Sequence, residues 1–425
     1  MNIDSPVECR RAIEALRAGV PNRDAVGALR CEQPAIEQVF RDRLRESKEH
    51  GTQGKQMPGI LVRGGFGTGK SHLLEYLQDI ALGDKFICSK VVISKETPLH
   101  DPVKFYRSAI HSAVAPGRTG SALGEIAMAL GLNPPSSAYN DLLRWVHNPE
   151  CKLDHRFAAT LFLVKHLTKA DEDMDRIIRF WSGEAIRASD LKKLLKAYGE
   201  RSTYSIRPVN QKDLAIQRLQ FLPRLMVAAG YAGWVLLVDE VELIGRYSRL
   251  QRGKSYAELA RWAGKVPNQQ LPCLTTVFAI TEGFENEVLE ATAKNDLEYV
   301  PALLESKALE ELATHAKRGM KLIQKDALSL KMPSDEAVRR TVEKVRDIYT
   351  KAYAWEPPPL EPGRRYGSTV MREQLKSWIN QWDLRRLYDY EGKTVIHDAE
   401  TKTDYTEDSD LEHPTEENSL DPASA

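Results

Sequence analysis

Eight residues near the start of the chain have the types and spacing needed to hold a phosphate group. They fit the pattern G-x-x-x-x-G-K-[ST] and are Gly64, Gly65, Phe66, Gly67, Thr68, Gly69, Lys70 and Ser71. The glycines let the backbone wrap a phosphate without Cβ clashes. We expect Lys70 to reach the β- and γ-phosphates and Ser71 to ligate Mg²⁺. The motif therefore predicts that the chain binds ATP with Mg²⁺. Phe66 and His72 belong to the same nucleotide-binding stretch but have no necessary chemistry, and we expect His72 to face outward from the first helical turn.

A second group of chemically useful residues follows an apolar run in the middle of the chain. Asp239 and Glu240 come directly after residues 234–238, Trp-Val-Leu-Leu-Val. In ATP hydrolysis the protein mainly positions Mg²⁺, the triphosphate and a water molecule. We therefore expect Asp239 to bind Mg²⁺ together with Ser71, and Glu240 to polarise the attacking water. The alternative is a strand that ends in two solvated acids.

Thr281 and four arginines are further candidates for this chemistry. Thr281 follows the predicted strand 274–280, where its hydroxyl would meet the γ-phosphate or the water, although threonine is also common at strand ends without such a role. We predict Lys70, Glu240 and Thr281 as the catalytic residues. Charge that develops on the γ-phosphoryl group also needs a cation beyond Lys70. The sequence offers Arg246, Arg249, Arg252 and Arg372 without selecting among them.

These residues must be positioned by strands that open at one edge of a sheet. Residues 60–62 form a short apolar run before the glycine loop, and apolar residues at helical spacing follow it. In this arrangement loop amides and a helix N-terminus converge on an anion. The run 234–238 is apolar throughout, which is typical of a parallel strand covered on both faces, and residues 274–280 (Leu-Thr-Thr-Val-Phe-Ala-Ile) predict another buried strand. Residues 86–94 predict a further strand. We expect an α/β fold of the P-loop NTPase class, in which a parallel sheet is flanked by helices.

Interruptions of the α/β alternation predict six segments. The helical pattern between residues 115 and 212 separates two parts of the core, so we interpret it as a helical insertion. Residues 213–290 carry the acid pair and Thr281. The expected segments are an N-terminal helical segment (1–58), the first part of the core (59–114), the insertion (115–212), the second part of the core (213–290), a C-terminal helical lid domain (291–396) and a disordered acidic tail (397–425).

Composition is typical of a soluble globular protein. The chain has 425 residues, of which 42% are hydrophobic and 28% charged. Because it has no long uncharged apolar run and no signal sequence, we expect no contact with the membrane and a cytoplasmic location. The cysteines are scattered without a C-x-x-C pair, which predicts a reducing compartment and no zinc site.

Charge is distributed unevenly along the chain. The formal net charge is zero, but from Asp398 to the end ten acidic residues stand against Lys402 alone, a net charge of −9. This tail has too few large apolar residues to order itself, so we expect it to be disordered. The remaining chain carries +9, which permits contact with nucleic acid. The tail is then either a solubilising segment or an intramolecular mimic of the DNA backbone.

With these motifs in place, the chain resembles the AAA+ and STAND branch of P-loop ATPases, to which the acid pair points. More closely, it is similar to the BREX-type ATP-binding family of bacterial phage-exclusion systems. Residues 11–23, 64–72 and 238–242 carry this similarity, which extends over about residues 6–390. The size, the insertion and the single ATPase core are similar to those of the D component of these systems. Such families carry a sensor arginine on a lid helix, where Arg372 stands in this chain with a loose match.

The resemblance implies an ATP-binding and ATP-hydrolysing protein that acts with other phage-defence proteins. Turnover would be coupled to remodelling of duplex DNA or of a partner protein. The alternative is a slowly hydrolysing switch of the origin-recognition or STAND type that clamps DNA or a partner. A small-molecule kinase is disfavoured by the acid pair and by the length of the insertion. The sequence leaves open the partner proteins, the DNA sequence preference, assembly into a homo-oligomer and the rate of hydrolysis.

Overall fold

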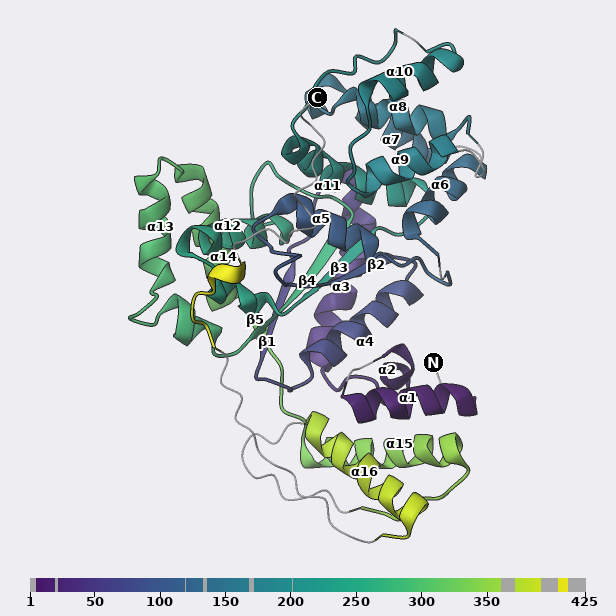
Figure 1. The fold of residues 1–425 in the computed structure, drawn as a ribbon, viewed down its shortest axis with the longest axis vertical. Helices are drawn as coiled ribbons and strands as arrows, with labels where there is room; N and C mark the ends of the chain where they lie inside the picture. Colours follow the sequence, from purple (N-terminus) through teal and green to yellow (C-terminus); the bar gives the residue numbers. More distant parts are fainter. Residues whose placement is uncertain are drawn as a thin grey trace.

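A parallel β-sheet lies at the centre of the molecule (Figure 1). The computed structural model describes residues 5–19, 22–118, 120–132, 136–167, 172–200, 202–360, 371–390 and 404–411. Within these residues five strands pair in the order β2-β3-β4-β1-β5, and every pair is parallel. The strands are β1 (Ile60–Gly64), β2 (Ile87–Val92), β3 (Trp234–Asp239), β4 (Leu274–Thr281) and β5 (Ala327–Ser329). The expected α/β class with a parallel sheet is confirmed.

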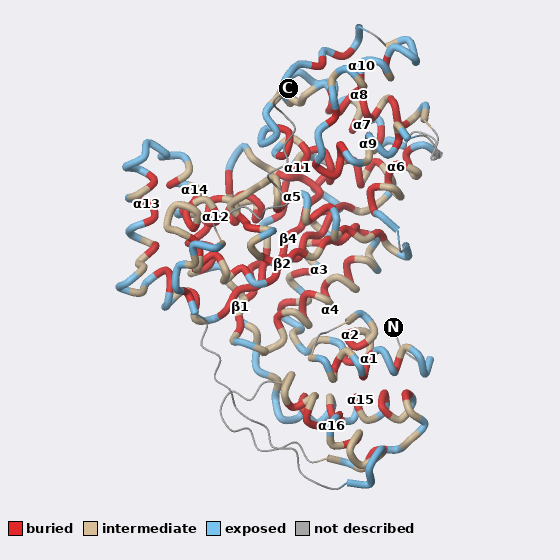
Figure 2. Tube along the Cα trace, in the orientation of Figure 1, coloured by how far each residue is buried: buried red, intermediate tan, exposed pale blue. Residues whose placement is uncertain are grey.

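Successive residues of the central strands enter two different cores, one on each face of the sheet. Leu236 and Val238 pack into one core, whereas Val235 and Leu237 pack into the other. All residues of β3 and β4 are buried, as was predicted from the continuous apolar run of β3 and the mainly apolar run of β4 (Figure 2). The sheet therefore exposes only its edges and strand ends, and functional groups must lie at those ends.

Different helices cover the two faces. The smaller core packs the helix that precedes β1 and the helix that follows the glycine loop, α3 (Pro34–His50) and α4 (Lys70–Gly83), onto the sheet. The larger core contains the helices of the opposite face, which are α5 (Pro102–His111), α11 (Gln211–Ala228), α12 (Arg249–Trp262), α13 (Asp296–Ser306) and α14 (Glu310–Lys325). Trp262 of α12 contacts both Phe105 and Trp234 edge-on, which ties this helix to α5 and β3.

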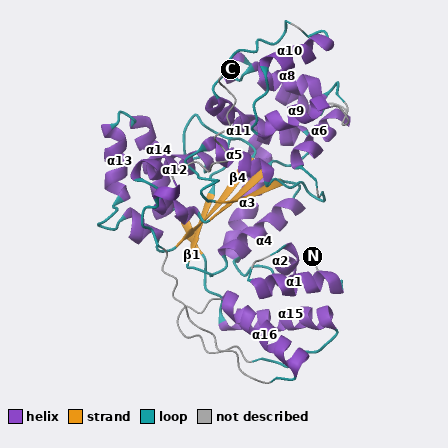
Figure 3. Cartoon of the chain, in the orientation of Figure 1, coloured by secondary structure: helices purple, strands orange, loops and turns teal. Residues whose placement is uncertain are grey.

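The chain between β2 and β3 builds a helical block beyond one edge of the sheet (Figure 3). Its helices are α6 (Ala122–Leu132), α7 (Ser137–Val146), α8 (His155–Val164), α9 (Glu172–Ser182) and α10 (Ala188–Ala197). Side-chain oxygens of Ser136 and Asp154 cap α7 and α8. Trp181 of α9 is fully buried and donates from Nε1 to Thr160 Oγ1 of α8 at 3.0 Å. The apolar residues of the block continue the larger core, so it is packed against the sheet and not separate from it.

A third core joins helices from the two ends of the sequence. It lies between α1 (Pro6–Ala18), α2 (Arg23–Leu29), α15 (Asp335–Tyr353) and α16 (Met371–Tyr388), at the bottom of Figure 1. An ion pair of 2.8 Å between Arg17 and Asp383 links α1 to α16, and Tyr349 of α15 donates to the same carboxylate at 2.7 Å. We call these four helices the terminal helical unit.

The N-terminal segment is helical as expected, and the Asn22 side chain accepts from the Ala25 amide at 2.8 Å and caps α2. The structure differs from the expected segments in two places. Strand β5 lies in a region expected to be helical, because three residues are too few to show a strand pattern. The expected lid domain is divided, since α13 and α14 pack on α12 whereas α15 and α16 pack on α1. Residues 361–370 and 391–396 of that segment lie outside the described residues.

Part of the expected disordered tail is packed against the core. In residues 404–411, Tyr405 is only 6% exposed, and Glu407 and Asp408 form ion pairs with Arg252 and Arg246. One aromatic ring and two acid–arginine pairs are enough to hold this segment, although the tail has few large apolar residues. The rest of residues 397–425 lies outside the described residues.

None of the helices in the described ranges combines the length and apolarity required to cross a bilayer. The remaining short helices are η1 (Gly51–Gln53), η2 (Pro149–Cys151), η3 (Val241–Arg246), η4 (Glu285–Leu289) and η5 (Ser409–Leu411).

Replacement of Trp382 tests whether the terminal helical unit supports the rest of the molecule. Trp382 is fully buried between α16 and α15 and donates from Nε1 to Pro358 O at 3.1 Å. Trp382→Ala should lower the free energy of unfolding by about 3–5 kcal/mol, because it leaves a large cavity. Chemical denaturation gives the measurement. Tyr388→Ala on the same helix is the control, since Tyr388 is 73% exposed, and a loss of similar size in both variants would contradict the packing.

Candidate nucleotide-binding site

The glycine loop is a tight turn between β1 and α4. Gly67 and Gly69 have φ angles of 68° and 102°, in the left-handed region that glycine enters without strain. Gly64 is needed for a different reason, because a Cβ at this position would lie 2.7 Å from Thr68 Oγ1. Thr68 Oγ1 in turn donates to Gly65 O at 2.9 Å. These contacts fix the loop in a shape that directs the N-terminus of α4 toward the space in front of it.

Lys70 is the first residue of α4 and lies across the loop. Its Nζ donates to Gly64 O at 3.0 Å and to Gly65 O at 3.1 Å, and the residue is only 8% exposed. Burial lowers the pKa of Lys70, while the nearby carboxylates of Glu242, Asp239 and Glu240 act in the opposite direction. The loop therefore holds a cation at its centre, with three acids close by.

The acid pair lies at the carboxyl end of β3. Asp239 is 5% exposed, and its Oδ1 accepts a hydrogen bond from the Glu240 amide at 3.0 Å. Glu240 has φ 56° and ψ 38°, a left-handed conformation that costs a non-glycine residue about 1–2 kcal/mol. The buried strand before it and η3 after it hold Glu240 in this conformation. Burial and the neighbouring Asp239 raise the pKa of Glu240, and Lys70 and Arg372 oppose the rise.

Glu242 is a third acid of the site, to which the sequence pattern assigned no role. It lines the same pocket from η3, and its Oε2 is buried and has no hydrogen-bond partner among the described residues. Burial raises the pKa of Glu242 to about 7, against the opposing effect of Lys70. The sequence could have indicated this role, because Glu242 is an acid three residues after Asp239. A short helix after the strand brings a residue at this spacing back to the side on which the strand ends.

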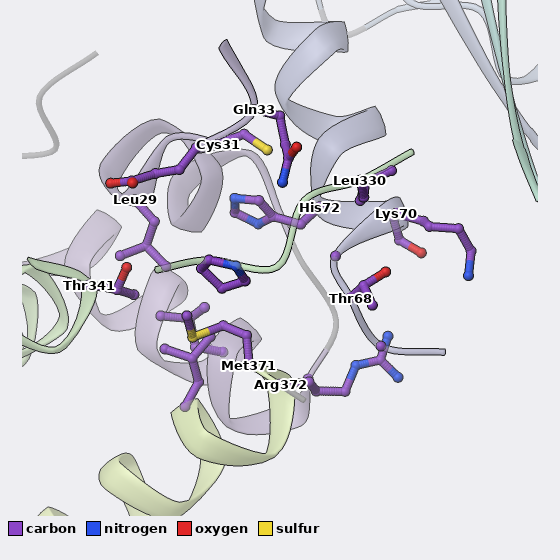
Figure 4. A pocket seen from close by; sticks show the side chains of 18 of the residues that line it. Leu29, Cys31, Gln33, Thr68, Lys70, His72, Leu330, Thr341, Met371 and Arg372 are labelled. Carbon is purple, nitrogen blue, oxygen red and sulfur yellow. The ribbon is translucent and has the colours of Figure 1, made fainter. Parts of the chain in front are cut away.

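A single pocket of about 270 Å³ brings these groups together. Four parts of the chain form its wall: the glycine loop, the acids after β3, the segment from α1 to α3, and α15 with α16. Figure 4 shows Thr68, Lys70 and Arg372 on one side of the pocket and Leu29, Cys31 and Thr341 on the other. The first side carries the loop lysine and an arginine. The rest of the wall contains Leu16, Leu29, Met371 and Leu375 beside polar residues such as Glu32 and Thr341, which suits a ligand with a phosphate end and a less charged end.

Comparison with known families agrees with this pocket. The family model described as BREX system ATP-binding protein BrxC/D matches residues 5–128 and 150–379. The chain belongs to this family. It is an ATP-binding protein of a phage-defence system, and the resemblance carried by its motifs is confirmed. Neither the curated proteins nor the solved structures contain a match to the chain.

Two residues of the BREX family's glycine-loop segment differ in their surroundings. Phe66 is 56% exposed, and the Arg372 guanidinium lies 5.9 Å from the centre of its ring. His72 does not face outward as expected. Its Nε2 lies 2.8 Å from Arg30 O, and burial lowers its pKa. The reason is that α2 packs on α4 and brings its C-terminus against the first turn of that helix.

Thr281 lies near the site but is not part of the pocket wall. The register of β1 and β4 places Thr281 beside Gly64, at the start of the glycine loop. The residue is 6% exposed, and its Oγ1 lies 2.6 Å from the Tyr405 hydroxyl. The hydroxyl that was expected to meet the γ-phosphate is thus engaged with the C-terminal segment.

The structure separates the four candidate arginines. Arg252 is fully buried and pairs with Asp296 at 2.8 Å, and Arg246 pairs with Asp408 at 2.7 Å. Arg249 lies over the Tyr299 ring, 5.0 Å from its centre. Of the four, Arg372 lines the pocket, and it reaches the pocket from the second position of α16.

The residues present fit a bound Mg²⁺. Ser71 and Asp239 line the same pocket and supply the hard oxygen donors that this ion prefers. Mg²⁺ usually takes only one or two carboxylates and completes its shell with phosphates and water. Accordingly, the described residues contain no group of three or more His, Cys, Asp and Glu side chains arranged around a metal position.

Replacement of Lys70 tests the phosphate end of the pocket. Lys70→Ala should weaken ATP binding at least tenfold, because a hydrogen bond to a charged group is worth about 1.5–3 kcal/mol. Titration calorimetry with ATP measures the change, and circular dichroism checks the fold. The control is Lys55→Ala, which removes the same charge from an exposed position before β1. Unchanged ATP affinity in folded Lys70→Ala would refute the assignment.

Glu242 predicts a pH dependence of stability. Its pKa in the folded chain, about 7, lies above the ordinary value of 4.5, so the folded state holds more protons between these pH values. Stability should therefore fall as pH rises through this window. Glu242→Gln removes the effect. The difference between the thermal midpoint of this variant and that of the unmodified protein should therefore increase, in favour of the variant, as the pH is raised from 5 to 8. Glu343→Gln, an exposed change on α15, should show no such trend.

Proposed function

We propose that the pocket binds ATP with Mg²⁺ and hydrolyses it, and that turnover drives remodelling of DNA or of a partner protein in the phage-defence system. One observation carries the proposal. Lys70, Ser71, Asp239 and Glu240 come from two separate strand ends and line the same pocket. A cation for phosphate, two oxygen donors for a metal and a carboxylate for water are the parts that phosphoryl transfer to water requires.

The two sides of the pocket suit the two ends of ATP. Amides of the glycine loop and the N-terminus of α4 would hold the phosphates, assisted by Lys70. The base and sugar would lie against Leu16, Leu29, Met371 and Leu375, which line the opposite wall. Because these side chains belong to the terminal helical unit, binding of the nucleobase would depend on that unit as well as on the sheet.

Glu240 is the proposed base. It lines the pocket directly after the end of β3, next to Asp239. Its raised pKa favours acceptance of a proton from water. Ser71 and Asp239 would hold Mg²⁺, which when bound neutralises charge on the phosphates. The left-handed backbone at Glu240 supports this role, because strained residues of this kind cluster at functional sites.

Arg372 is the proposed second cation for the γ-phosphate. It lines the pocket, and its charge acts on both Lys70 and Glu240. Since it belongs to α16, a shift of the terminal helical unit would move this charge relative to the phosphates. Hydrolysis would then respond to the position of the unit.

A slowly hydrolysing switch is the second candidate function. It is favoured by the bond between Thr281 and Tyr405, which engages a hydroxyl otherwise available to the γ-phosphate or the water. Steady-state ATP turnover with and without duplex DNA distinguishes the two functions. Strong stimulation by DNA supports a DNA-coupled machine, whereas slow turnover that DNA leaves unchanged supports a switch. The assay must be run over a range of salt, because contacts to DNA phosphates weaken steeply as salt rises.

Replacement of the acid pair tests the proposed division of roles. Glu240→Gln should retain binding of ATP with Mg²⁺ but slow hydrolysis about 10²-fold or more, the size of a general-base contribution. Asp239→Asn should instead weaken binding and its dependence on Mg²⁺ together. Phosphate release and nucleotide binding are measured separately for each variant.

The matched control is Glu282→Gln, since Glu282 is an exposed acid that directly follows β4 as Glu240 follows β3. It should turn over ATP at the unmodified rate. Normal turnover in Glu240→Gln would show that Glu240 is not the base. Glu242 would then be the next candidate, because it also lines the pocket.

A further inference from the structure

Residues 404–411 pack against residues of the ATPase core that are remote from them in the sequence. In Figure 1 this segment is the yellow piece beside α12. The segment pairs with no strand of the sheet, and its contacts are made by side chains and by one backbone bond, from Asp408 N to Arg246 O at 2.9 Å. The residues that contact it come from the end of β4, from η3 and α12, and from Phe284, and Lys294 lies close by. We call this contact surface the tail groove.

The tail groove is shaped to receive an aromatic ring. Tyr405 packs edge-on against Phe284, with ring centres 5.7 Å apart, and its hydroxyl meets Thr281 Oγ1. A Cβ on Gly245 would lie 2.6 Å from Cδ1 of Tyr405, so no larger residue fits there without displacing the ring. The space for this side chain is thus built into η3.

The tail groove also matches the charge of its occupant. Glu407 pairs with Arg252 at 2.5 Å and Asp408 pairs with Arg246 at 2.7 Å. Lys294 adds a third positive charge, and it donates to Gly245 O inside the groove. The segment Asp-Tyr-Thr-Glu-Asp at residues 404–408 presents acids on both sides of the ring. A basic groove with an aromatic pocket therefore meets an acidic peptide with an aromatic anchor.

The groove borders the parts of the site that act on water. Gly245 and Arg246 belong to η3, which begins directly after Glu240, and Thr281 is in register with Gly64. An occupied groove engages the Thr281 hydroxyl and holds η3 through contacts with Gly245 and Arg246. The position of Glu240 is then set partly by the docked segment.

We propose that the tail groove is a docking site for acidic peptides with an aromatic anchor, that residues 404–411 of this chain are its occupant, and that docking restrains ATP turnover by engaging Thr281 and fixing η3. The restraint rests on the proposed hydrolysis, whereas the docking does not. Release of the segment would free the threonine hydroxyl and let η3 adjust around bound nucleotide.

The contacts favour reversible docking. Both carboxylates are partly exposed, since Glu407 is 53% exposed and Asp408 is 30% exposed. The Arg246–Asp408 pair is exposed on both sides, and such pairs contribute little to stability, whereas Arg252 is buried and keeps Asp296 as a second partner when Glu407 leaves. Ordering the backbone of the segment opposes its docking. The single buried ring is the principal anchor. Because salt screens the ion pairs, docking should weaken as ionic strength rises.

The first experiment measures docking without hydrolysis. Full-length Tyr405→Ala, in which the anchor is removed, is titrated with a fluorescent synthetic peptide of residues 404–411 in the absence of nucleotide. We expect saturable binding that weakens with salt. A peptide carrying Tyr405→Ala should bind at least tenfold more weakly, whereas one carrying Asp410→Asn, which removes a charge that pairs with no arginine of the groove, should bind within about threefold. Absence of binding, or equal binding of all three peptides, would overturn the docking.

The second experiment measures the restraint. Full-length Tyr405→Ala and Tyr405→Phe should hydrolyse ATP about fivefold faster or more, within the usual range of coupling between sites, with ATP affinity unchanged. The free peptide added to Tyr405→Ala should restore the slow rate, and full-length Asp410→Asn should match the unmodified protein. Peptide binding without any change in turnover would overturn the restraint. If no version hydrolyses ATP, the proposed function and the restraint both fail, while the peptide titration still decides the docking.

Discussion

Backbone hydrogen bonds between β3, β4 and β1 set the geometry on which the nucleotide site depends. Their register brings Gly64 beside Thr281 and Val238 beside Phe278, so the glycine loop and the acid pair end at the same edge of the sheet. No side-chain contact between the loop and the acids is required to hold this arrangement. It follows from three buried strands whose side chains fill a core on each face. Loss of packing on either face would therefore misplace the site even if every functional residue were retained.

The electrostatics of the pocket follow from burial as much as from charge. Lys70 is surrounded by Asp239, Glu240 and Glu242, and in the described structure it bonds to loop carbonyls and not to a carboxylate. Burial disfavours the charged form of the lysine and of both glutamates, which lowers the pKa of Lys70 and raises those of the acids. Glu242, whose pKa is raised to about 7, therefore changes its protonation near neutral pH. Binding of a highly charged ligand such as ATP would change that balance.

The sequence predicted most of the sheet and the identity of the pocket's charged side, because those features are local. Ile60 to Ser71 carry strand, loop and helix in one stretch, and the apolar run before Asp239 marks a buried strand without reference to the rest of the chain. Features that depend on distant contacts were not predictable in this way. Strand β5 exists because it pairs with β1, and His72 is turned inward because α2 packs beside it. Residues 404–411 are packed because they contact Gly245, Arg246 and Arg252. The sequence of the tail alone does not indicate these contacts.

The apolar wall of the pocket draws on both ends of the sequence. Leu16 of α1 and Leu375 of α16 line the same space, and Arg17 bonds to Asp383 across a separation of 366 residues. During synthesis on the ribosome, the glycine loop and the acid pair emerge long before α16 does. The growing chain can then form the phosphate side of the pocket but not the side that would enclose the base. Full affinity for nucleotide would then require that α16 has been synthesised and has packed on α1, and such long-range contacts are typical of slow folding. In the cell, bound ATP would mark chains in which α1 and α16 have come into contact.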